Sequence, residues 1–249
     1  MTKASETGHA KNVAHFGDLI IYLITLGTAY APVKPSLLIA ALQTKFTSAK
    51  DALSAINALL PDWSNAINAR EIVFSPLSKL ITRVVAAVEA SDVSIQFIND
   101  VKFYARKLQG KRATPKKATI ADDPSTPEDE SQKSISASQM SFDNRIENMD
   151  KLIDLLSSQS NYNPNEDDLK VASLTILHTS MKTTNTAVIT TSSPLSNARI
   201  NRDVILYHKV TGLVKISKEV KAYVKSVFGA TSPQFKLVSK FKFTTPKQK

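Results

Sequence analysis

The stretch DLIIYLITLGTAYAPVKPSLLIAAL, residues 18–42, recurs in altered form as DKLIDLLSSQSNYNPNEDDLKVASL, residues 150–174. Each stretch carries an apolar run, a turn with tyrosine and proline, and then a second apolar run. Apolar residues three and four positions apart predict a helix on either side of that turn. Identical positions in the two stretches include Tyr30/Tyr162, Pro32/Pro164, Leu37/Leu169 and Leu42/Leu174.

The repeat extends well beyond this turn. An offset of 132 residues aligns residues 13–84 with residues 145–216 without a gap, and 16 of the 72 positions are identical. A second block, residues 101–117 against residues 220–236, aligns at an offset of 119, which assigns 13 extra residues to the first copy. Self-similarity over this length indicates a tandem duplication.

Both copies predict helices, so the expected fold class is all-α: two tandem, structurally similar bundles of four to five helices. The expected domains are a first bundle over residues 1–110, a flexible linker over 111–140 and a second bundle over 141–249. The linker lacks apolar periodicity and is rich in proline, serine and charge. We also expect the copies to pack through equivalent faces as an intramolecular pseudo-dimer. In the first copy the predicted helices cover residues 16–29, 35–56 and 76–88, one that begins at Asp62 or Ser64 and stops before Pro76, and one that is capped by Ser91 or Asp92 and ends at Gly110. In the second copy they cover residues 142–159, 165–190, 196–207 and 211–228, with a short one after Ser232.

Composition restricts the function classes. The chain has no cysteine, which excludes thiolate metal sites, disulfides and cysteine nucleophiles. No apolar run approaches the length of a membrane span, and the short N-terminal run from Leu19 to Leu26 fits a buried helix face better than a signal peptide. We therefore expect a cytoplasmic protein.

No catalytic, cofactor-binding or metal-binding motif stands out. The six glycines form no phosphate-binding loop, and the four histidines form no metal-binding pair. His208 follows Asp203 by five residues, but no nucleophile elbow accompanies them. The acidic run Glu166-Asp167-Asp168 suits the first turn of a helix, with cation ligation as the alternative. The expectation is a protein that is not an enzyme and needs no cofactor.

Positive charge gathers late in the chain. From Ile205 onward ten lysines face Glu219 alone, out of a net charge of +10 for the whole chain. Helical geometry places four of these lysines opposite an apolar stripe. Such a surface suits phosphate-rich partners, although a solvated helix face explains it equally well. The candidate polyanion-binding residues are Lys215, Lys218, Lys221, Lys225, Lys236, Lys240 and Lys242.

Two arginines recur at equivalent positions, each followed by an acid. A residue repeated within one chain suggests the same structural role in each copy, here an ion pair between helices. The alternative is a pair of equivalent anion sites. The residues concerned are Arg70, Glu71, Arg202 and Asp203.

Several segments, among them NAREIVFSPLSKLITRV, SASQMSFDNRIENMDKLIDLL and VKSVFGATSPQFK, resemble a family of bacterial all-helical proteins with an internal duplication and no assigned activity. The resemblance implies a cytoplasmic helical protein and transfers no site residue. The functional expectation is a non-catalytic scaffold or assembly protein that binds a protein partner or itself. The alternative is non-specific nucleic-acid binding through the lysine-rich stripe.

Overall fold

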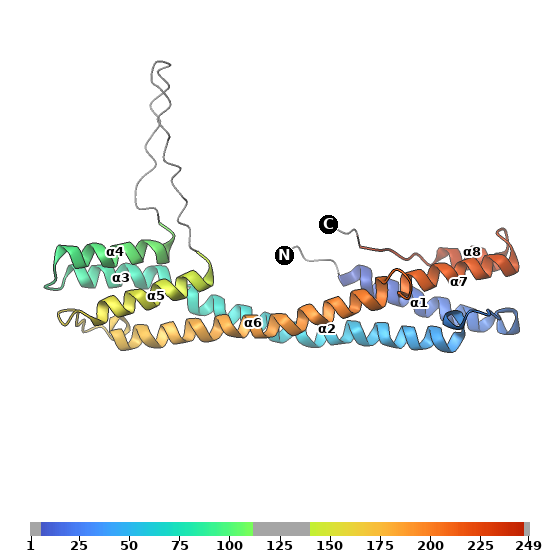
Figure 1. The fold of residues 1–249 in the computed structure, drawn as a ribbon, viewed down its shortest axis with the longest axis horizontal. Coiled ribbons are helices and arrows are strands. Elements are labelled where there is room, and N and C mark those ends of the chain that lie inside the picture. Colours follow the sequence, from blue (N-terminus) through green and yellow to red (C-terminus); the bar gives the residue numbers. More distant parts are fainter. Residues whose placement is uncertain (1–5, 112–139, 247–249) are drawn as a thin grey trace, which may run out of the picture. The chain divides into compact units, whose positions relative to one another are not determined.

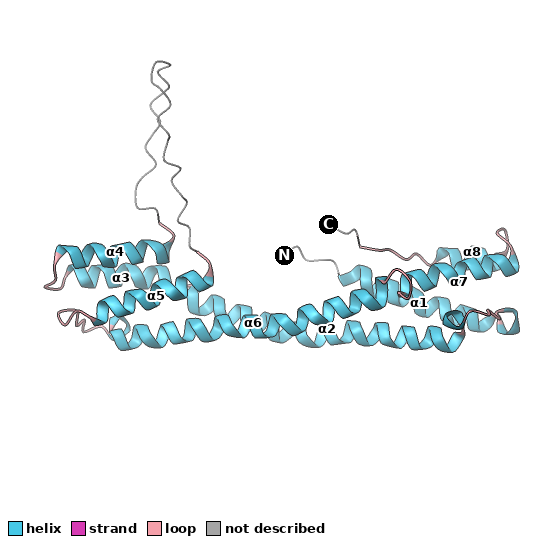
Figure 2. Ribbon diagram, in the orientation of Figure 1, coloured by secondary structure: helices cyan, strands magenta, loops and turns pink. Residues whose placement is uncertain are grey.

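A computed structural model describes residues 6–111 and 140–246 of the chain. Within these ranges every regular element is helical and no strand forms (Figure 2). The all-α prediction is therefore confirmed. The predicted linker, residues 111–140, lies outside the described residues except for its two end residues.

The helices follow one another in a repeating order (Figure 1). A helix comes first, a short 3₁₀ turn follows, and then a very long helix and two further helices. The first series is α1 (Glu6–Thr25), η1 (Gly27–Ala29), η2 (Pro35–Leu37), α2 (Ile39–Phe74), α3 (Leu77–Glu89) and α4 (Ile95–Gln109). The second series is α5 (Phe142–Ser157), η3 (Asp167–Leu169), α6 (Val171–Tyr207), α7 (Leu213–Phe228) and α8 (Pro233–Lys240).

The two long helices differ from the prediction. We expected α2 to break before Asp62 or Ser64 and α6 to break between residues 190 and 196, but both helices continue through a proline, Pro61 and Pro194. A proline inside a helix removes only one backbone hydrogen bond and bends the axis. Buried residues flank each proline along its helix, Ile56 and Phe74 in α2 and Val188 and Leu195 in α6, and their burial offsets that local cost. The predicted breaks were wrong.

Several helix ends were predicted from capping residues, and the structure confirms most of these predictions. Gly110 ends α4 with a positive φ of 66°, and Gly229 ends α7 with a φ of 89°. Ser232 caps α8 by accepting a hydrogen bond from the Phe235 amide at 3.1 Å. The cap of α4 is Ser94, where we expected Ser91 or Asp92. Serine oxygens at these positions satisfy amides that the first turn leaves without partners.

The chain divides into two units whose boundaries differ from the predicted domains at residues 1–110 and 141–249. Unit 1 comprises Met1–Trp63 and Thr191–Lys249, whereas unit 2 comprises Ser64–Thr190. The difference arises because α2 begins in unit 1 and ends in unit 2, while α6 does the reverse. Each unit therefore combines helices from both halves of the sequence.

Each unit has its own apolar core. In unit 1, α1 contributes residues at helical spacing, such as Phe16, Leu19 and Leu23, which pack with Val220 and Val224 of α7. In unit 2, the buried side chains of α3, α4 and α5 pack together with the first half of α6. Figure 1 shows α3, α4 and α5 running beside one another in this unit. The core residues of α3 are Leu77, Ile81, Val84 and Val88, all fully buried.

Candidate functional site

The net positive charge of the protein belongs entirely to one unit. Unit 1 holds 17 of the 32 Lys and Arg residues and 6 of the 22 Asp and Glu residues, a net charge of +11. Unit 2 holds the remaining 15 and 16, a net charge of −1. The net positive charge of the chain therefore originates in unit 1.

Helix α7 carries four of the predicted lysines, and three of them are exposed: Lys215, Lys218 and Lys225. Lys215 lies 3.5 Å from the carboxylate of Glu219, the acid that also binds Lys34 at 2.6 Å. Lys218 has no protein partner among the described residues. These three side chains are available to an incoming phosphate.

Lys221 departs from the predicted stripe because it is half-buried. Its ammonium group donates a hydrogen bond to the carbonyl of Phe241 and lies 5.1 Å from the centre of the Phe243 ring. Burial, together with the nearby positive charge of Lys242, lowers the pKa of Lys221. Lys221 thus holds the chain that follows α8 and contributes little to a solvent-facing charge stripe.

The remaining predicted lysines, Lys236, Lys240 and Lys242, are exposed on α8 and on the segment after it. Lys225 lies 5.9 Å from the ring of Phe235, which places α7 and α8 charge on neighbouring surface. Six of the seven predicted lysines are therefore solvent-facing, and Lys221 is the exception. Lysines Lys247 and Lys249 lie outside the described residues.

The two recurring arginines do not share one role. Arg202 is 4% exposed, and its Nε and Nη2 atoms both lie 2.9 Å from the carboxylate of its neighbour Asp203. Arg70 does not pair with Glu71 in the described structure. It donates to Asn185 at 3.0 Å and stacks 3.7 Å from the centre of the Phe142 ring. The pairs were predicted to join two helices, but Arg202 and Asp203 are neighbours within α6. Arg70 contacts an amide and an aromatic face instead of Glu71.

Arg70 belongs to a cluster that ties together α2, α5 and α6 in unit 2. Asn185, which accepts the hydrogen bond from Arg70, in turn donates one to the carboxylate of Asp143 at 2.7 Å. Arg145 donates to the carbonyl of Phe74 at 3.2 Å, and burial lowers its pKa. The Phe74 and Phe142 rings meet edge to face at 4.9 Å. Arginines packed on aromatic faces in this way stabilise a helix junction.

The acidic run at residues 166–168 lies against α3. Asp168 accepts two hydrogen bonds from the guanidinium of Arg83, and Asp167 binds Lys170 at 2.6 Å. The hydrogen bonds and charge of Asp168 raise the pKa of Arg83, and Glu166 adds to the effect. No group of three potential metal ligands occurs in the part of the chain that the structure describes. The carboxylates of Asp167 and Asp168 are each engaged by a cation of the protein itself.

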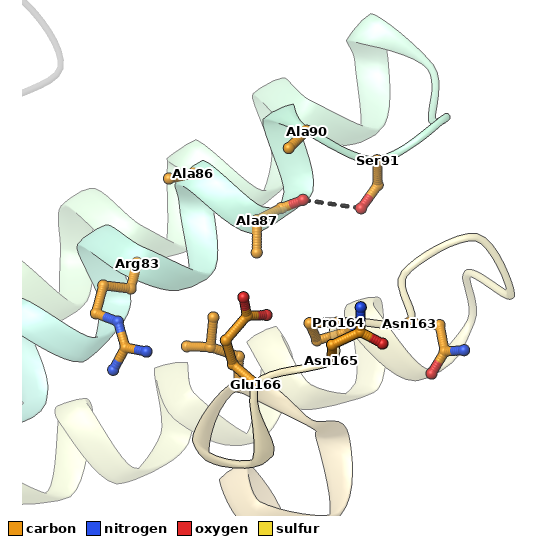
Figure 3. A pocket seen from close by; sticks show the side chains of 10 residues that line it. Arg83, Ala86, Ala87, Ala90, Ser91, Asn163, Pro164, Asn165 and Glu166 are labelled. Atoms are coloured by element: carbon orange, nitrogen blue, oxygen red, sulfur yellow. Dashed lines mark hydrogen bonds between the residues drawn. The ribbon is translucent and has the colours of Figure 1, made fainter.

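A groove of about 450 Å³ lies beside this ion pair (Figure 3). Ala86 and Ala87 of α3, with Ala90 just after its end, form one wall, and the polar residues of the loop before η3 form the other. Ser91, at its end, donates to the Ala87 carbonyl at 2.8 Å. The groove is open, and its lining offers amides and a carboxylate without a nucleophile and base in contact. The sequence did not indicate it, because alanines and loop asparagines carry no motif.

The pairing of Asp203 and His208 considered from the sequence does not assemble. Asp203 binds Arg202, while Nδ1 of His208 accepts the amide of Thr211 at 3.2 Å and so closes the turn before α7. No helix of the described residues has the length and hydropathy of a membrane span. None of the protein-family models, curated proteins or solved structures compared with this chain matches it.

Proposed function

We propose that this protein is a non-catalytic scaffold built by duplication of one helical motif, whose two units present related but chemically different surfaces to partners. The observation that carries the proposal is a buried bond made twice. Tyr30 donates its hydroxyl hydrogen to the carbonyl of Leu37, and Tyr162 donates to that of Leu169, both at 2.8 Å. Both tyrosines stand 132 residues apart and both precede a 3₁₀ turn.

The order and burial of the other elements support the same view. Leu42 and Leu174, at the first turns of α2 and α6, are both fully buried. Helices α3 and α7 share a buried spacing, Leu77 and Val84 against Leu213 and Val220. Helices α4 and α8 both follow a capping serine. This correspondence pairs α3 with α7, whereas the second sequence block had paired residues 101–109 of α4 with residues 220–228 of α7.

Self-association and partner capture test the scaffold proposal. We expect light scattering of the full chain to show a mass above that of one chain, or affinity purification to retain a defined protein. A strict monomer that retains no partner would contradict the proposal. Helical circular dichroism under the same conditions serves as the control for folding.

A second function, polyanion binding by unit 1, is favoured by the net charge of +11 on that unit against −1 on unit 2. The solvent-facing lysines carry flexible point charges, which contact phosphates without reading bases. Binding would then be insensitive to nucleotide sequence and would weaken steeply with salt, because each phosphate contact releases a counterion.

A gel shift with duplex DNA at low salt tests this second function. Changing Lys215, Lys218, Lys225, Lys236, Lys240 and Lys242 to glutamine should weaken binding and flatten the salt dependence by about 0.9 per lost phosphate contact. Lys221 is left intact because it holds the chain after α8. The matched control changes six unit 2 lysines, Lys79, Lys102, Lys107, Lys151, Lys170 and Lys182. No shift, or an equal effect in both variants, would exclude the function.

A further inference from the structure

Residues 241–246, after α8, belong to no helix or strand in the described structure, and Figure 1 draws them as an open trace. Phe241 has extended backbone angles, with a φ of −68° and a ψ of 107°. Their side chains alternate in exposure: Phe241 and Phe243 are half-buried against the core of unit 1, whereas Lys242 and Thr244 are exposed. An extended chain normally satisfies its backbone groups in a sheet. Here side chains of two helices take over that role.

Side chains of α1 and α7 hold the backbone of this segment at three residues. Lys221 donates to the carbonyl of Phe241, and Nδ1 of His15 lies 2.7 Å from the carbonyl of Lys242. Asn12 makes two bonds to Thr244: its Nδ2 donates to the carbonyl at 2.7 Å, and its Oδ1 accepts the amide at 3.0 Å. An asparagine side chain that pairs with both groups of one residue copies the hydrogen bonding of a neighbouring strand.

The asparagine is held in place by a buried network. Asn12 is 1% exposed and also donates to the hydroxyl of Tyr207 at 3.2 Å. The same hydroxyl lies 2.6 Å from Nδ1 of His9, which is 4% exposed. Because these side chains are fixed by one another, the amide is oriented before a segment arrives, which lowers the entropic cost of binding.

The aromatic side chains provide the selectivity. The ring of His15 lies 6.3 Å from that of Phe241 and 6.2 Å from that of Phe243. The polar bonds are all made to backbone atoms, so they accept any sequence. The site therefore recognises an extended chain with aromatic residues at two alternate positions and tolerates other residues between them.

A comparison with unit 2 shows which element residues 241–246 replace in unit 1. There α4, 15 residues long, packs along both α3 and α5. In unit 1, α8 starts from the same kind of serine cap but ends after 8 residues, so the segment covers surface that a longer helix would otherwise occupy. A cover made of extended chain and held by side chains can exchange more readily than a helix that is part of the core.

We propose that the surface formed by Asn12, His15 and Lys221 is a binding site for extended aromatic–x–aromatic segments, filled in cis by residues 241–246 and in trans by the same segment of a second copy. An identical segment restores every contact, so exchange between copies costs no interaction. The proposal rests on the self-association part of the proposed function and assigns the residues that carry it.

The first experiment measures the site directly. The full chain shortened after Lys240 should bind a fluorescent peptide of residues 236–246, followed by polarisation. Replacing both phenylalanines of the peptide by alanine should weaken binding about tenfold or more. Asn12→Ala in the shortened chain should weaken it about tenfold, the loss of two hydrogen bonds. The intact chain should bind the peptide less well, because its own segment competes at high effective concentration.

Absence of binding by a shortened chain that keeps its helical circular dichroism would overturn the proposal, as would equal binding of the alanine peptide. If shortening unfolds the protein, the full-length variant Phe241→Ala/Phe243→Ala replaces it in the same assay.

A second experiment separates this inference from the scaffold proposal. Mixed with the shortened chain, the intact chain should form a complex by light scattering, and the Phe241→Ala/Phe243→Ala chain should not. Self-association that is unchanged by these substitutions would leave the scaffold proposal standing and refute the exchange of segments.

Discussion

The two units have a similar order of helices but differ in the chemistry of their side-chain contacts. The N-terminal parts of α1 and α5, the helices that open each series, show this difference most clearly. In unit 1, His9, Asn12 and Tyr207 form a buried hydrogen-bonded network. In unit 2, Phe142 and Arg145, near the start of α5, instead pack against the ring of Phe74, one through an aromatic ring and the other through a guanidinium. The two solutions differ in how completely they satisfy buried polar atoms: in the described part of unit 2 the Nε atoms of Arg70 and Arg145 are buried without a hydrogen-bond partner, and the guanidinium groups rest on aromatic rings instead.

An ion pair on the surface of each unit shows a similar contrast. In unit 2 the helix α3 supplies the cation of the pair, whereas in unit 1 the helix α7 supplies the anion. Arg83, the seventh residue of α3, binds Asp168 of η3. Glu219, the seventh residue of α7, binds Lys34, next to η2. With partners exchanged, Arg83 would face Lys34 and Glu219 would face Asp168, so like charges would meet. The apolar positions thus define what the units share, and the polar ones distinguish them.

The largest expected effect tests whether the shared core is equally important in both units. Leu42→Ala and Leu174→Ala each remove a fully buried side chain at equivalent positions. Each should lower the free energy of unfolding by about 2–5 kcal/mol, measured by urea denaturation. The exposed Ile176→Ala is the control and should change little. A large effect at one leucine and none at the other would break the equivalence of the units.

The next effect tests the network found only in unit 1. Tyr207→Phe removes the hydroxyl shared by His9 and Asn12 and should cost about 1–3 kcal/mol of stability. Tyr223→Phe is a matched control, because that tyrosine meets Tyr30 through its ring. Equal stability of the two variants would show that the network does not stabilise unit 1.

A smaller effect concerns the bond made in both units. Tyr30→Phe and Tyr162→Phe should each cost about 0.5–1.5 kcal/mol. Burial raises the pKa of both tyrosines, that of Tyr162 to about 12. An unfolded tyrosine ionises near pH 10, so the unfolded state loses its proton first as the pH rises.

The stabilisation from these tyrosines should therefore be complete below about pH 10 and decline above it. Denaturation at increasing alkaline pH should show this fall in the native chain and a weaker fall in the double variant. An identical pH dependence in both would contradict the assignment.

The smallest effect concerns the inverted ion pairs, which are largely exposed and so weak. Lys34→Glu should destabilise unit 1, and adding Glu219→Lys should restore stability. The hydrogen bond from Lys34 lowers the pKa of Glu219, with a further effect of Lys215, so this stabilisation is present above about pH 4.5 and is lost as the pH falls. A double variant no more stable than the single variant would show that the charges do not select their partners.

Local signals in the sequence were sufficient for the elements themselves. Apolar spacing placed α3 and α7, and the residues at Gly110, Gly229 and Ser232 marked helix ends, because these signals act over a few residues. The first helix was predicted over residues 16–29, but α1 spans Glu6–Thr25, because its first ten residues include His9 and Asn12, which are polar and yet buried. The seven candidate lysines were also found by spacing, and six are solvent-facing. The repeated tyrosine and leucine positions pointed to equivalent turns that the structure builds in the same way.

Tertiary packing decided the rest. The continuity of α2 and α6 through Pro61 and Pro194 depends on neighbours that stabilise both sides of each proline, and those neighbours are distant in sequence. Several polar contacts also depend on residues that are distant in sequence. Examples are the hydrogen bond from Lys221, the hydrogen bond from Arg70 to Asn185, and the hydrogen bonds between Asn12 and Thr244, which are 232 positions apart. Sequence determined which segments become helices, because helix formation is local. Only the packed chain decided which helices share a core and which polar groups meet, because those choices depend on burial.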